Sequence, residues 1–349
     1  MSEQHSRRRF MQETAVFTAA GMGAVAPGLM AQAADNKRET AAQTQAEKDA
    51  ALFKDSIRIG TLVKGEDNPP EYIRQIVDHG FESFCIYFWH EVPDKETLLV
   101  MADKIHEVLA GRDAVISSLS VYGNPLGTTP EDEHVRGAWK RLIDAAPHFG
   151  CDIVSGFTGR VEEESIDKNI PRFKEVFEPL VKHAGDSGVR IAFENCPMGG
   201  NWSRGKWNIA HNPVAWELMF DALPQENMGL EWEPAHQLVQ LIDPLPQLRK
   251  WAPKIFHLHG KDTMVQWDVI RECGIGWGKK YAHHRSPGFG DTNWVDVISI
   301  LREHNFKGCI DIEGWHDPVY QGKLEMTGQV YSLNYLKQCR TVFVPNPTL

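Results

Sequence analysis

Short apolar runs and stretches with helical spacing alternate along most of this chain, and this alternation limits the fold more than any other feature. Eight runs are typical of buried strands because they are short and rich in branched and aromatic residues. They cover residues 57–63, 81–89, 114–123, 151–159, 189–197, 227–234, 254–262 and 308–315. Helical periodicity lies between them, at 70–80, 95–111, 135–150, 170–188 and 294–306. Several of these stretches end at a glycine, the residue preferred just after a helix.

Strands that alternate with helices predict an α/β protein with a parallel sheet, because each helix returns the chain to the same edge. Eight is the strand number of the (β/α)8 TIM barrel, and this is the fold that we predict. A doubly wound open sheet is the alternative. No G-x-G-x-x-G follows the first strand, so a dinucleotide-binding version of that sheet has little support. The loop from Met264 to Asp291 is long, and we expect it to be a lid or a wall of the substrate site.

The first 33 residues have the pattern of an export signal. Arg7 and Arg8 precede Phe10, an apolar stretch rich in Ala and Gly follows, and Ala31 to Ala33 offers a small-residue cleavage site. This order predicts a twin-arginine signal peptide, export by the twin-arginine machinery, and a periplasmic or otherwise exported mature protein. A flexible basic tail is the alternative. The apolar stretch is too short and too rich in glycine to span a membrane, so we predict no membrane association after cleavage.

The remaining chain is predicted to be one domain behind a linker. Residues 34–54 are polar and predict a linker or a loose surface helix, and residues 55–349 predict a single barrel. The net charge of −10 disfavours a nucleic-acid partner, which would need a basic face. Three of the six cysteines sit in or beside apolar runs, and a chain exported already folded has first met the reducing cytoplasm. We therefore favour free thiols.

Polar side chains stand at the ends of the last four predicted strands. They are Glu194, Glu233, His259 and Glu313. A single Glu at a strand end is more often a solvated rim residue, and a single His more often a hydrogen-bonded core residue. Four successive strands that meet at one rim of a barrel favour a common role instead. Three carboxylates and one imidazole suit a divalent cation with open positions: Mn²⁺ first, with Mg²⁺, Co²⁺ and Zn²⁺ as alternatives.

From about residue 55 to 340 the chain resembles the xylose isomerase-like TIM barrels, the sugar phosphate isomerase/epimerase superfamily. The resemblance is carried by Glu194, by Glu233-Pro234-Ala235-His236, by H-G-K-D from His259, by Glu313, and by HRSPGFGDTNW at 284–294. In the epimerase branch, residues at these four strand ends hold one metal ion. The resemblance thus implies Glu194, Glu233, His259 and Glu313 as metal ligands, with Glu194 and Glu313 also moving protons.

The resemblance also implies that His236 orients substrate oxygens. The chemistry of Lys261, Arg285 and Trp315 predicts substrate contacts for them too: an ammonium for an oxyanion, a guanidinium for a hydroxyl or carboxylate, and an aromatic wall for a sugar ring. For Lys261, a rim ion pair with Asp262 is an equally open alternative. His257 lies two residues before His259, on the same strand face but deeper. We expect His257 and Asp262 to contact the metal ligands and to orient them, without binding the metal themselves.

Two departures separate this chain from the ketose 3-epimerases of the family. Glu233 stands where Asp is usual, and its side chain is one methylene longer. The H-x-x-E-x-x-R run that follows strand seven is missing, because the chain reads HGKDTMVQW there. Both departures weaken an assignment as a free-ketose epimerase.

The resemblance implies a metal-dependent sugar isomerase or epimerase that removes a proton next to a carbonyl, through an enediolate, on a keto-sugar or sugar derivative. Expulsion of a leaving group by the same residues makes a lyase or hydrolase of 3-keto-glycosides the main alternative. Two alternatives are more remote. One is a non-catalytic periplasmic sugar-binding barrel. The other is an endonuclease IV-like DNA repair enzyme, and the acidic net charge and the shortage of histidines disfavour this one. The partner is a small-molecule carbohydrate. The sugar, the native metal and the formation of a homo-oligomer stay open.

Overall fold

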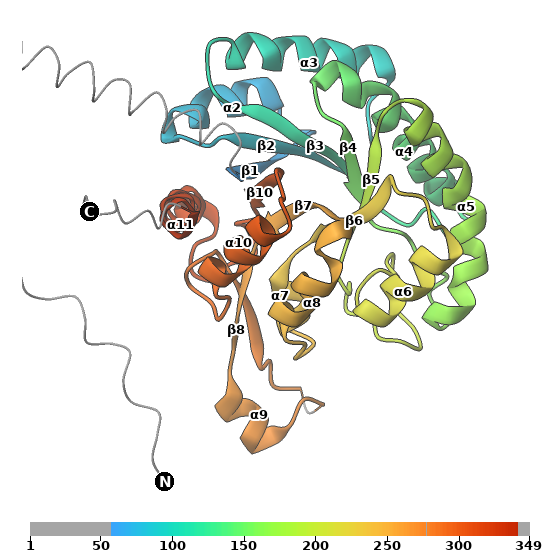
Figure 1. The fold of residues 1–349 in the computed structure, drawn as a ribbon, viewed down its shortest axis with the longest axis vertical. Coiled ribbons are helices and arrows are strands. Elements are labelled where there is room, and N and C mark those ends of the chain that lie inside the picture. The colour runs from blue at the N-terminus through green and yellow to red at the C-terminus, as the bar shows by residue number, and fades with distance from the viewer. Residues whose placement is uncertain (1–56, 277, 341–349) are drawn as a thin grey trace, which may run out of the picture. The chain divides into compact units, whose positions relative to one another are not determined.

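The computed structural model describes residues 57–276 and 278–340 (Figure 1). The predicted signal peptide at 1–33 and the linker at 34–54 lie outside the described residues. So do the first and last residues of the predicted barrel domain.

Eight parallel strands close into a barrel, which confirms the predicted (β/α)8 fold. The strands are β1 (Arg58–Lys64), β2 (Ser83–Trp89), β3 (Val115–Tyr122), β4 (Ile153–Gly156), β5 (Arg190–Glu194), β6 (Met228–Trp232), β7 (Ile255–Gly260) and β10 (Cys309–Ile312). Neighbours in the chain are neighbours in the barrel, and β10 pairs with both β7 and β1. All eight carboxyl ends therefore lie at one rim.

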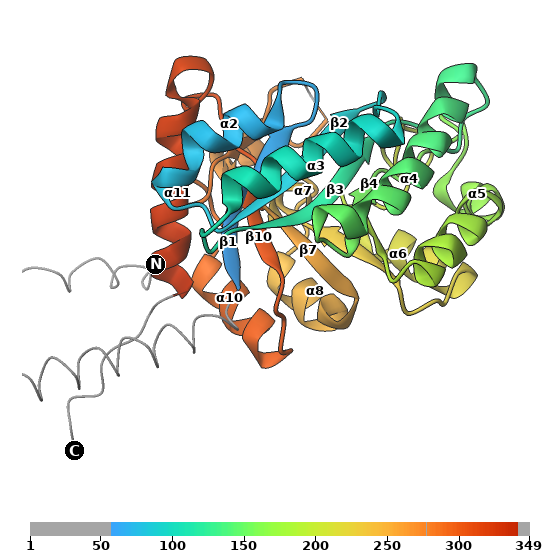
Figure 2. The same ribbon diagram turned by 90° about the horizontal axis from the view of Figure 1, so that it is seen from above.

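Helices surround the barrel in the figures (Figures 1 and 2). They are α2 (Pro69–Ile76), α3 (Lys95–Leu109), α4 (Pro130–Phe149), α5 (Ile166–Asp186), α6 (Pro213–Ala222), α7 (Pro234–Leu238), α8 (Pro244–Trp251), α10 (Trp294–Glu303) and α11 (Glu325–Arg340). Their apolar faces pack on the strands. Between α4, α5 and β5, for example, the rings of Trp139, Phe177 and Phe193 meet edge-on or tilted, with centroids 4.8–5.9 Å apart.

Helix α4 begins earlier than the apolar periodicity predicts, because a capping residue sets its start. Helix α4 begins at Pro130, five residues before the first predicted position, and Thr129 forms a capping box with Asp132. The Thr129 hydroxyl accepts the Asp132 N–H at 3.2 Å, and the Asp132 carboxylate accepts the Thr129 N–H at 2.8 Å. Both bonds satisfy N–H groups that the first helical turn leaves unpaired.

The end of α11 ties the last helix to the amino-terminal side of the barrel. The Arg340 guanidinium donates to the Ile57 carbonyl at 2.7 Å and to both carboxylate oxygens of Glu82, just before β2. Lys337 also lies 3.3 Å from Glu82. These contacts lie at the end of the barrel opposite the carboxyl rim.

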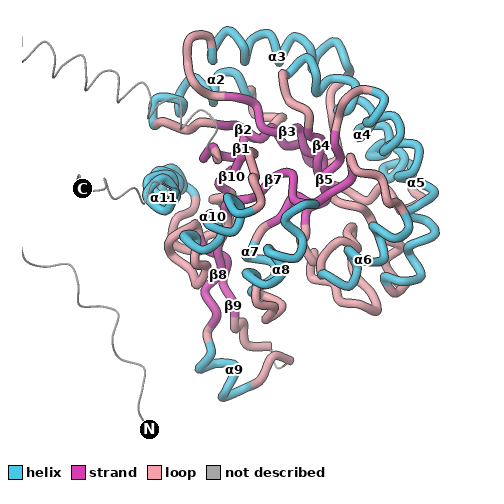
Figure 3. Tube along the Cα trace, viewed as in Figure 1, coloured by secondary structure: helices cyan, strands magenta, loops and turns pink. Residues whose placement is uncertain are grey.

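The segment predicted as a long loop is instead a hairpin with its own secondary structure (Figure 3). Strands β8 (Asp262–Val265) and β9 (Ala282–Arg285) pair antiparallel, and α9 (Trp267–Cys273) lies between them. The prediction of a loop was wrong because β8 directly continues the β7 run, and a four-residue strand leaves little periodic signal. The hairpin extends away from the barrel in Figure 1.

All six cysteines are unpaired, in agreement with the preference for free thiols. Among residues 57–276 and 278–340, no helix has both the length and the apolar character needed to cross a membrane.

The capping box gives a stability test. Replacing Thr129 by Ala removes the acceptor of the Asp132 N–H, and we expect the free energy of unfolding to fall by about 1 kcal/mol. Urea denaturation followed by circular dichroism measures it. Thr128→Ala, at the exposed position just before, is the control, and equal losses in both variants would contradict the assigned cap.

Candidate metal centre

Four side chains from four successive barrel strands meet at the carboxyl rim, and we call them the ligand cluster: Glu194, Glu233, His259 and Glu313. One ligand atom from each lies within 4.8 Å of one from every other. None is more than 5% exposed. The structure thus brings together the set that the sequence predicts for a metal ion.

Backbone contacts fix the strand ends that carry the cluster. The Asn195 side chain accepts the Glu233 N–H at 2.8 Å and donates to the Glu233 carbonyl at 2.9 Å, which links the ends of β5 and β6. The Asn208 amide donates to the Glu194 carbonyl at 2.8 Å. The Glu313 N–H donates to the Gly260 carbonyl at 3.1 Å, which links β10 to β7. The carboxylates therefore leave a rigid rim.

Several buried atoms of the cluster lack a hydrogen-bond partner. They are Oε2 of Glu233, Nδ1 of His259 and Oε2 of Glu313. A buried polar atom without a partner costs free energy, and native structures rarely leave several together. Oxygen and imidazole nitrogen are the donors that Mn²⁺, Co²⁺ and Zn²⁺ accept. The residues present therefore fit one divalent cation.

Two basic side chains from neighbouring strand ends lie against the carboxylates. Lys261 Nζ is 2.9 Å from Glu313 Oε1 and 3.5 Å from Glu233 Oε1. His236 Nε2 is 2.5 Å from Glu233 Oε1 and 3.5 Å from Glu194 Oε1. The alternative that Lys261 pairs with Asp262 is therefore wrong, because Lys261 points toward the ligand cluster.

The three carboxylates have different proton affinities. Burial raises the pKa of Glu194, and the charges of Glu233 and Glu313 act in the same direction. Burial also favours the neutral form of Glu233, but the charges of His236 and Lys261 outweigh it and lower the pKa to about 2. For Glu313 the same burial is outweighed by Lys261, which holds the pKa of that carboxyl well below its usual range.

A second layer of polar side chains lies below the ligand cluster, and we call it the inner layer: Glu231, His257 and Asp311. All three are 0% exposed. His257 Nδ1 is 2.8 Å from Glu231 and its Nε2 is 2.7 Å from Asp311. Ionised carboxylates only accept hydrogen bonds, so His257 donates from both nitrogens. Burial lowers the pKa of His257, but the bonds to Asp311 and Glu231 outweigh it and raise the pKa.

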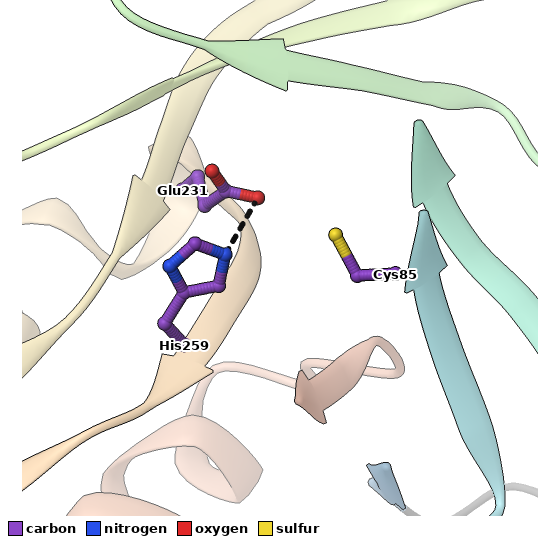
Figure 4. Close-up of side chains that lie close together, drawn as sticks. All are labelled: Cys85, Glu231 and His259. Carbon is purple, nitrogen blue, oxygen red and sulfur yellow. Dashed lines mark ion pairs between the residues drawn. The ribbon is translucent and has the colours of Figure 1, made fainter. Parts of the chain in front are cut away.

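The inner layer touches the cluster through His259 (Figure 4). His259 Nε2 is 3.2 Å from Glu231 Oε1, and the thiol of Cys85 on β2 lies near both. The sequence places His257 deeper in the barrel than His259, as the structure does, but Asp311 and Cys85 were missed. A signal for Asp311 was present: E-W-E, H-L-H and D-I-E each put two polar residues on one strand face.

A cavity of about 200 Å³ opens from the ligand cluster. It is lined by Glu194, His236, Lys261 and Glu313, by the aromatic side chains Trp89, Tyr122, Phe157 and Trp315, and by Leu62, Cys196, Met198, His284 and His316. The predicted substrate residues His236, Lys261 and Trp315 thus reach it. Trp315 stacks on Tyr87, with ring centroids 5.0 Å apart.

Two histidines in the cavity wall were missed. His284 comes from β9 of the hairpin, so this part of the predicted wall segment does reach the site. Burial, with the charges of Lys261 and His236, lowers the pKa of His284 to about 3, so its ring is neutral. His316 Nε2 lies 3.0 Å from Glu313 Oε1. Neither residue stands at the end of a barrel strand, so a search for polar residues at the ends of the predicted strands does not find them.

Arg285 and Asp262 have other contacts. The Arg285 Nε donates to Asp317 at 3.0 Å, and among the described residues Arg285 does not line this cavity. Asp262 accepts the N–H groups of Thr263 and Thr292 and the Trp294 indole at 2.8–3.3 Å. A Cβ at Gly290 would lie 2.4 Å from the Asp262 carboxylate, so the G-D-T-N-W segment needs this glycine to pack there. The structure therefore gives Asp262 a role in holding that segment.

Comparisons with known proteins agree with this fold. A profile of the family described as xylose isomerase-like TIM barrel matches residues 73–339. An inosose dehydratase from Clostridium tetani is 30% identical over 101 residues, which are 28% of this chain and 33% of that protein. The chain thus spans about a third of that curated relative.

Two solved structures show the same fold. A xylose isomerase-like TIM barrel protein from Mycobacterium smegmatis, in complex with magnesium, aligns with a TM-score of 0.61 at 17% identity, covering 82% of this chain and 98% of that one. A 3-keto-D-glucoside 4-epimerase from E. coli aligns with a TM-score of 0.59 at 14% identity, covering 81% of this chain and all of that one. At these identities the likeness shows the fold alone.

The unpartnered atoms of the cluster give a second test. Mn²⁺ or Co²⁺ added to chelator-treated protein should raise the midpoint of thermal unfolding, because the cation binds the folded state. The gain is about 2.7 kcal/mol at a free concentration 100 times Kd. Differential scanning calorimetry measures it.

The variants Glu233→Gln and Glu313→Gln should lose most of this shift. Glu217→Gln should keep it, since Glu217 pairs with Lys250 on the surface. A shift of equal size in all these variants would place the cation elsewhere.

Proposed function

The chain belongs to the xylose isomerase-like TIM barrel family, and on this premise we propose that it is a divalent-metal-dependent sugar isomerase or epimerase. The observation that carries the proposal is the ligand cluster, buried at the rim and open to a cavity with an aromatic wall. Flat apolar rings suit the faces of a sugar, and the carboxylates and bases opposite suit its oxygens.

The proposed reaction moves a proton on the carbon next to a carbonyl. Glu194 and Glu313 leave the rim from β5 and from the end of β10, with β6 and β7 between them in the barrel. From these positions one carboxylate removes the proton and the other returns it to a different face or to the neighbouring carbon. A divalent cation, when bound, would supply Lewis-acid stabilisation of the enediolate charge.

The other cavity residues bind and orient the substrate. Lys261 places an ammonium beside Glu313, where it offsets negative charge on a substrate oxygen. The Thr263 hydroxyl donates to the Ala235 carbonyl at 3.2 Å, so the His284 Nδ1–H, 3.2 Å from the same hydroxyl, donates to it. The His284 Nε2 then accepts a hydrogen bond, for example from a sugar hydroxyl.

A lyase acting by β-elimination is the second candidate. The inosose dehydratase of Clostridium tetani favours it, since loss of water next to a carbonyl begins with the same proton removal. In this chain the same two glutamates would remove the proton and assist a leaving group. For a 3-keto-glycoside the leaving group would be the second sugar or aglycone, so product identity separates the two candidates.

We also propose that the protein acts after export, on an unphosphorylated sugar or oxidised glycoside. The support is the arginine pair at Arg7 and Arg8 before the apolar stretch. With Arg7→Lys and Arg8→Lys together, the full chain should stay in the cytoplasmic fraction, while wild type reaches the exported fraction at its shorter, cleaved length. Immunoblots of cell fractions measure this, and equal export of both chains would contradict the proposal.

Deuterium exchange tests the reaction. The protein is incubated in D₂O with Co²⁺ and a panel of keto-sugars and 3-keto-glycosides, and the products are examined by NMR after the metal is removed by chelation. We expect deuterium at the carbon next to the carbonyl. Glu194→Gln and Glu313→Gln should each lower the rate roughly 10²–10⁴-fold, the usual contribution of a general acid or base.

The matched control is Glu217→Gln on the surface, which should exchange at the wild-type rate. Bound metal without exchange in any substrate would instead favour the non-catalytic sugar-binding barrel.

A further inference from the structure

Three of the strands that reach the ligand cluster carry a second polar residue two positions earlier. Glu231 precedes Glu233, His257 precedes His259, and Asp311 precedes Glu313. A period of two keeps each pair on the same face of its strand, here the barrel interior. The inner layer therefore lies one level below the ligands, and the proposed reaction does not use it.

Glu231 lies where several hydrogen-bond donors from different strands converge. Its Oε1 accepts from the Ser155 hydroxyl at 2.7 Å and from His257 Nδ1 at 2.8 Å, and its Oε2 accepts from the Tyr122 hydroxyl at 3.2 Å. His259 Nε2 approaches Oε1 at 3.2 Å. A carboxylate held by this many donors has little freedom to move.

The donors on Glu231 are themselves fixed. His257 Nε2 donates to Asp311 at 2.7 Å, and Asp311 also accepts the hydroxyls of Ser83 and Ser117. A continuous hydrogen-bonded path thus runs from β10 through β7 to β6, and an ion-pair contact of 3.2 Å joins Glu231 to His259. Every acidic or imidazole member of this path is at most 1% exposed.

This path determines which nitrogen of His259 can bind a cation. Nε2 faces a carboxylate and keeps its hydrogen, while Nδ1 lies 3.5 Å from both Glu233 Oε2 and Glu313 Oε2. A metal-binding histidine uses the lone pair of one nitrogen, and a carboxylate on the other nitrogen sets the tautomer and the ring orientation. Glu231 is placed to do this for His259.

Two other groups of possible metal ligands lie near the ligand cluster, and both are less suited to hold a cation. Cys85, Glu231 and His259 offer three ligand atoms within 4.8 Å, but the oxygens of Glu231 already accept hydrogen bonds, and burial raises the pKa of the Cys85 thiol to about 11. Glu194, Cys196 and His236 form a similar group. There His236 Nε2 already lies 2.5 Å from Glu233 Oε1.

We propose that Glu231, held by His257 and Asp311, is a positioning residue that fixes His259 as a metal ligand through Nδ1. The inference rests on the proposed function only in requiring that the ligand cluster bind a divalent cation. It needs no particular sugar or reaction.

The test is the Co²⁺ affinity of Glu231→Gln, measured by titration calorimetry and by the visible absorption of bound Co²⁺. The glutamine amide has nearly the volume of the carboxylate, but its NH₂ group cannot accept hydrogen bonds from the donors around it. The side chain at position 231 therefore no longer holds His259. We expect Kd for Co²⁺ to rise roughly 10–100-fold, the usual effect of losing such a partner. The intensity of the Co²⁺ bands should change as well, because the imidazole ligand is less firmly oriented.

Glu82→Gln is the matched control. It makes the same substitution at an ion-paired glutamate, but at the opposite end of the barrel, where Glu82 contacts Arg340. This variant should lose thermal stability and keep the wild-type Kd within about twofold, whereas a purely structural effect of Glu231→Gln would lower stability without changing Kd. Circular dichroism confirms that each variant is folded.

If Glu231→Gln does not fold, Ser155→Ala replaces it as the test, since it removes only one donor to Glu231 and should still weaken Co²⁺ binding measurably. An unchanged Kd in whichever folded variant is measured would overturn the inference, as would a wild type that does not bind Co²⁺. A wild type that binds Co²⁺ and exchanges no sugar proton would refute the proposed function alone, because Kd by itself decides the role of Glu231.

Discussion

Three carboxylates held close together inside a protein repel one another, and the rest of this site follows from how that repulsion is offset. The parallel barrel places Glu194, Glu233 and Glu313 at one buried rim, where water screens their charges poorly. Lys261 and His236 neutralise part of the charge through contacts of 2.5–3.5 Å. Two carboxylate oxygens and Nδ1 of His259 still lack hydrogen-bond partners. We propose that a divalent cation completes this arrangement.

The barrel interior is organised as two polar layers on the same strands. The upper layer presents ligand atoms to the cavity, and the lower layer, Glu231, His257 and Asp311, is fully buried and internally hydrogen-bonded. A half-satisfied polar layer would destabilise a core, whereas a connected one rigidifies it. The consequence for function is precision, because a ligand supported from below keeps its geometry when substrate enters from above.

The sequence was most informative where a simple period governs structure. All eight barrel strands were predicted because buried parallel strands are short apolar runs, and the ligand cluster was predicted because their ends meet at one rim. Helix α4 began earlier than predicted because Thr129 and Pro130 are capping residues, not apolar ones. His284 was missed because it comes from a hairpin inserted between barrel elements. Arg285 was predicted to contact substrate, and in the structure its guanidinium pairs with Asp317. Such contacts depend on where an insertion folds back, which no local period records.

We propose that one divalent cation lies among Glu194, Glu233, His259 and Glu313. Anomalous diffraction from crystals of the protein loaded with Mn²⁺, recorded at the manganese absorption edge, tests it directly. We expect a single strong peak at about 2.0–2.3 Å from one atom of each of the four side chains, with His259 bound through Nδ1. A peak at the Cys85 or Cys196 thiol instead, or a fully loaded crystal with no peak at the rim, would contradict it.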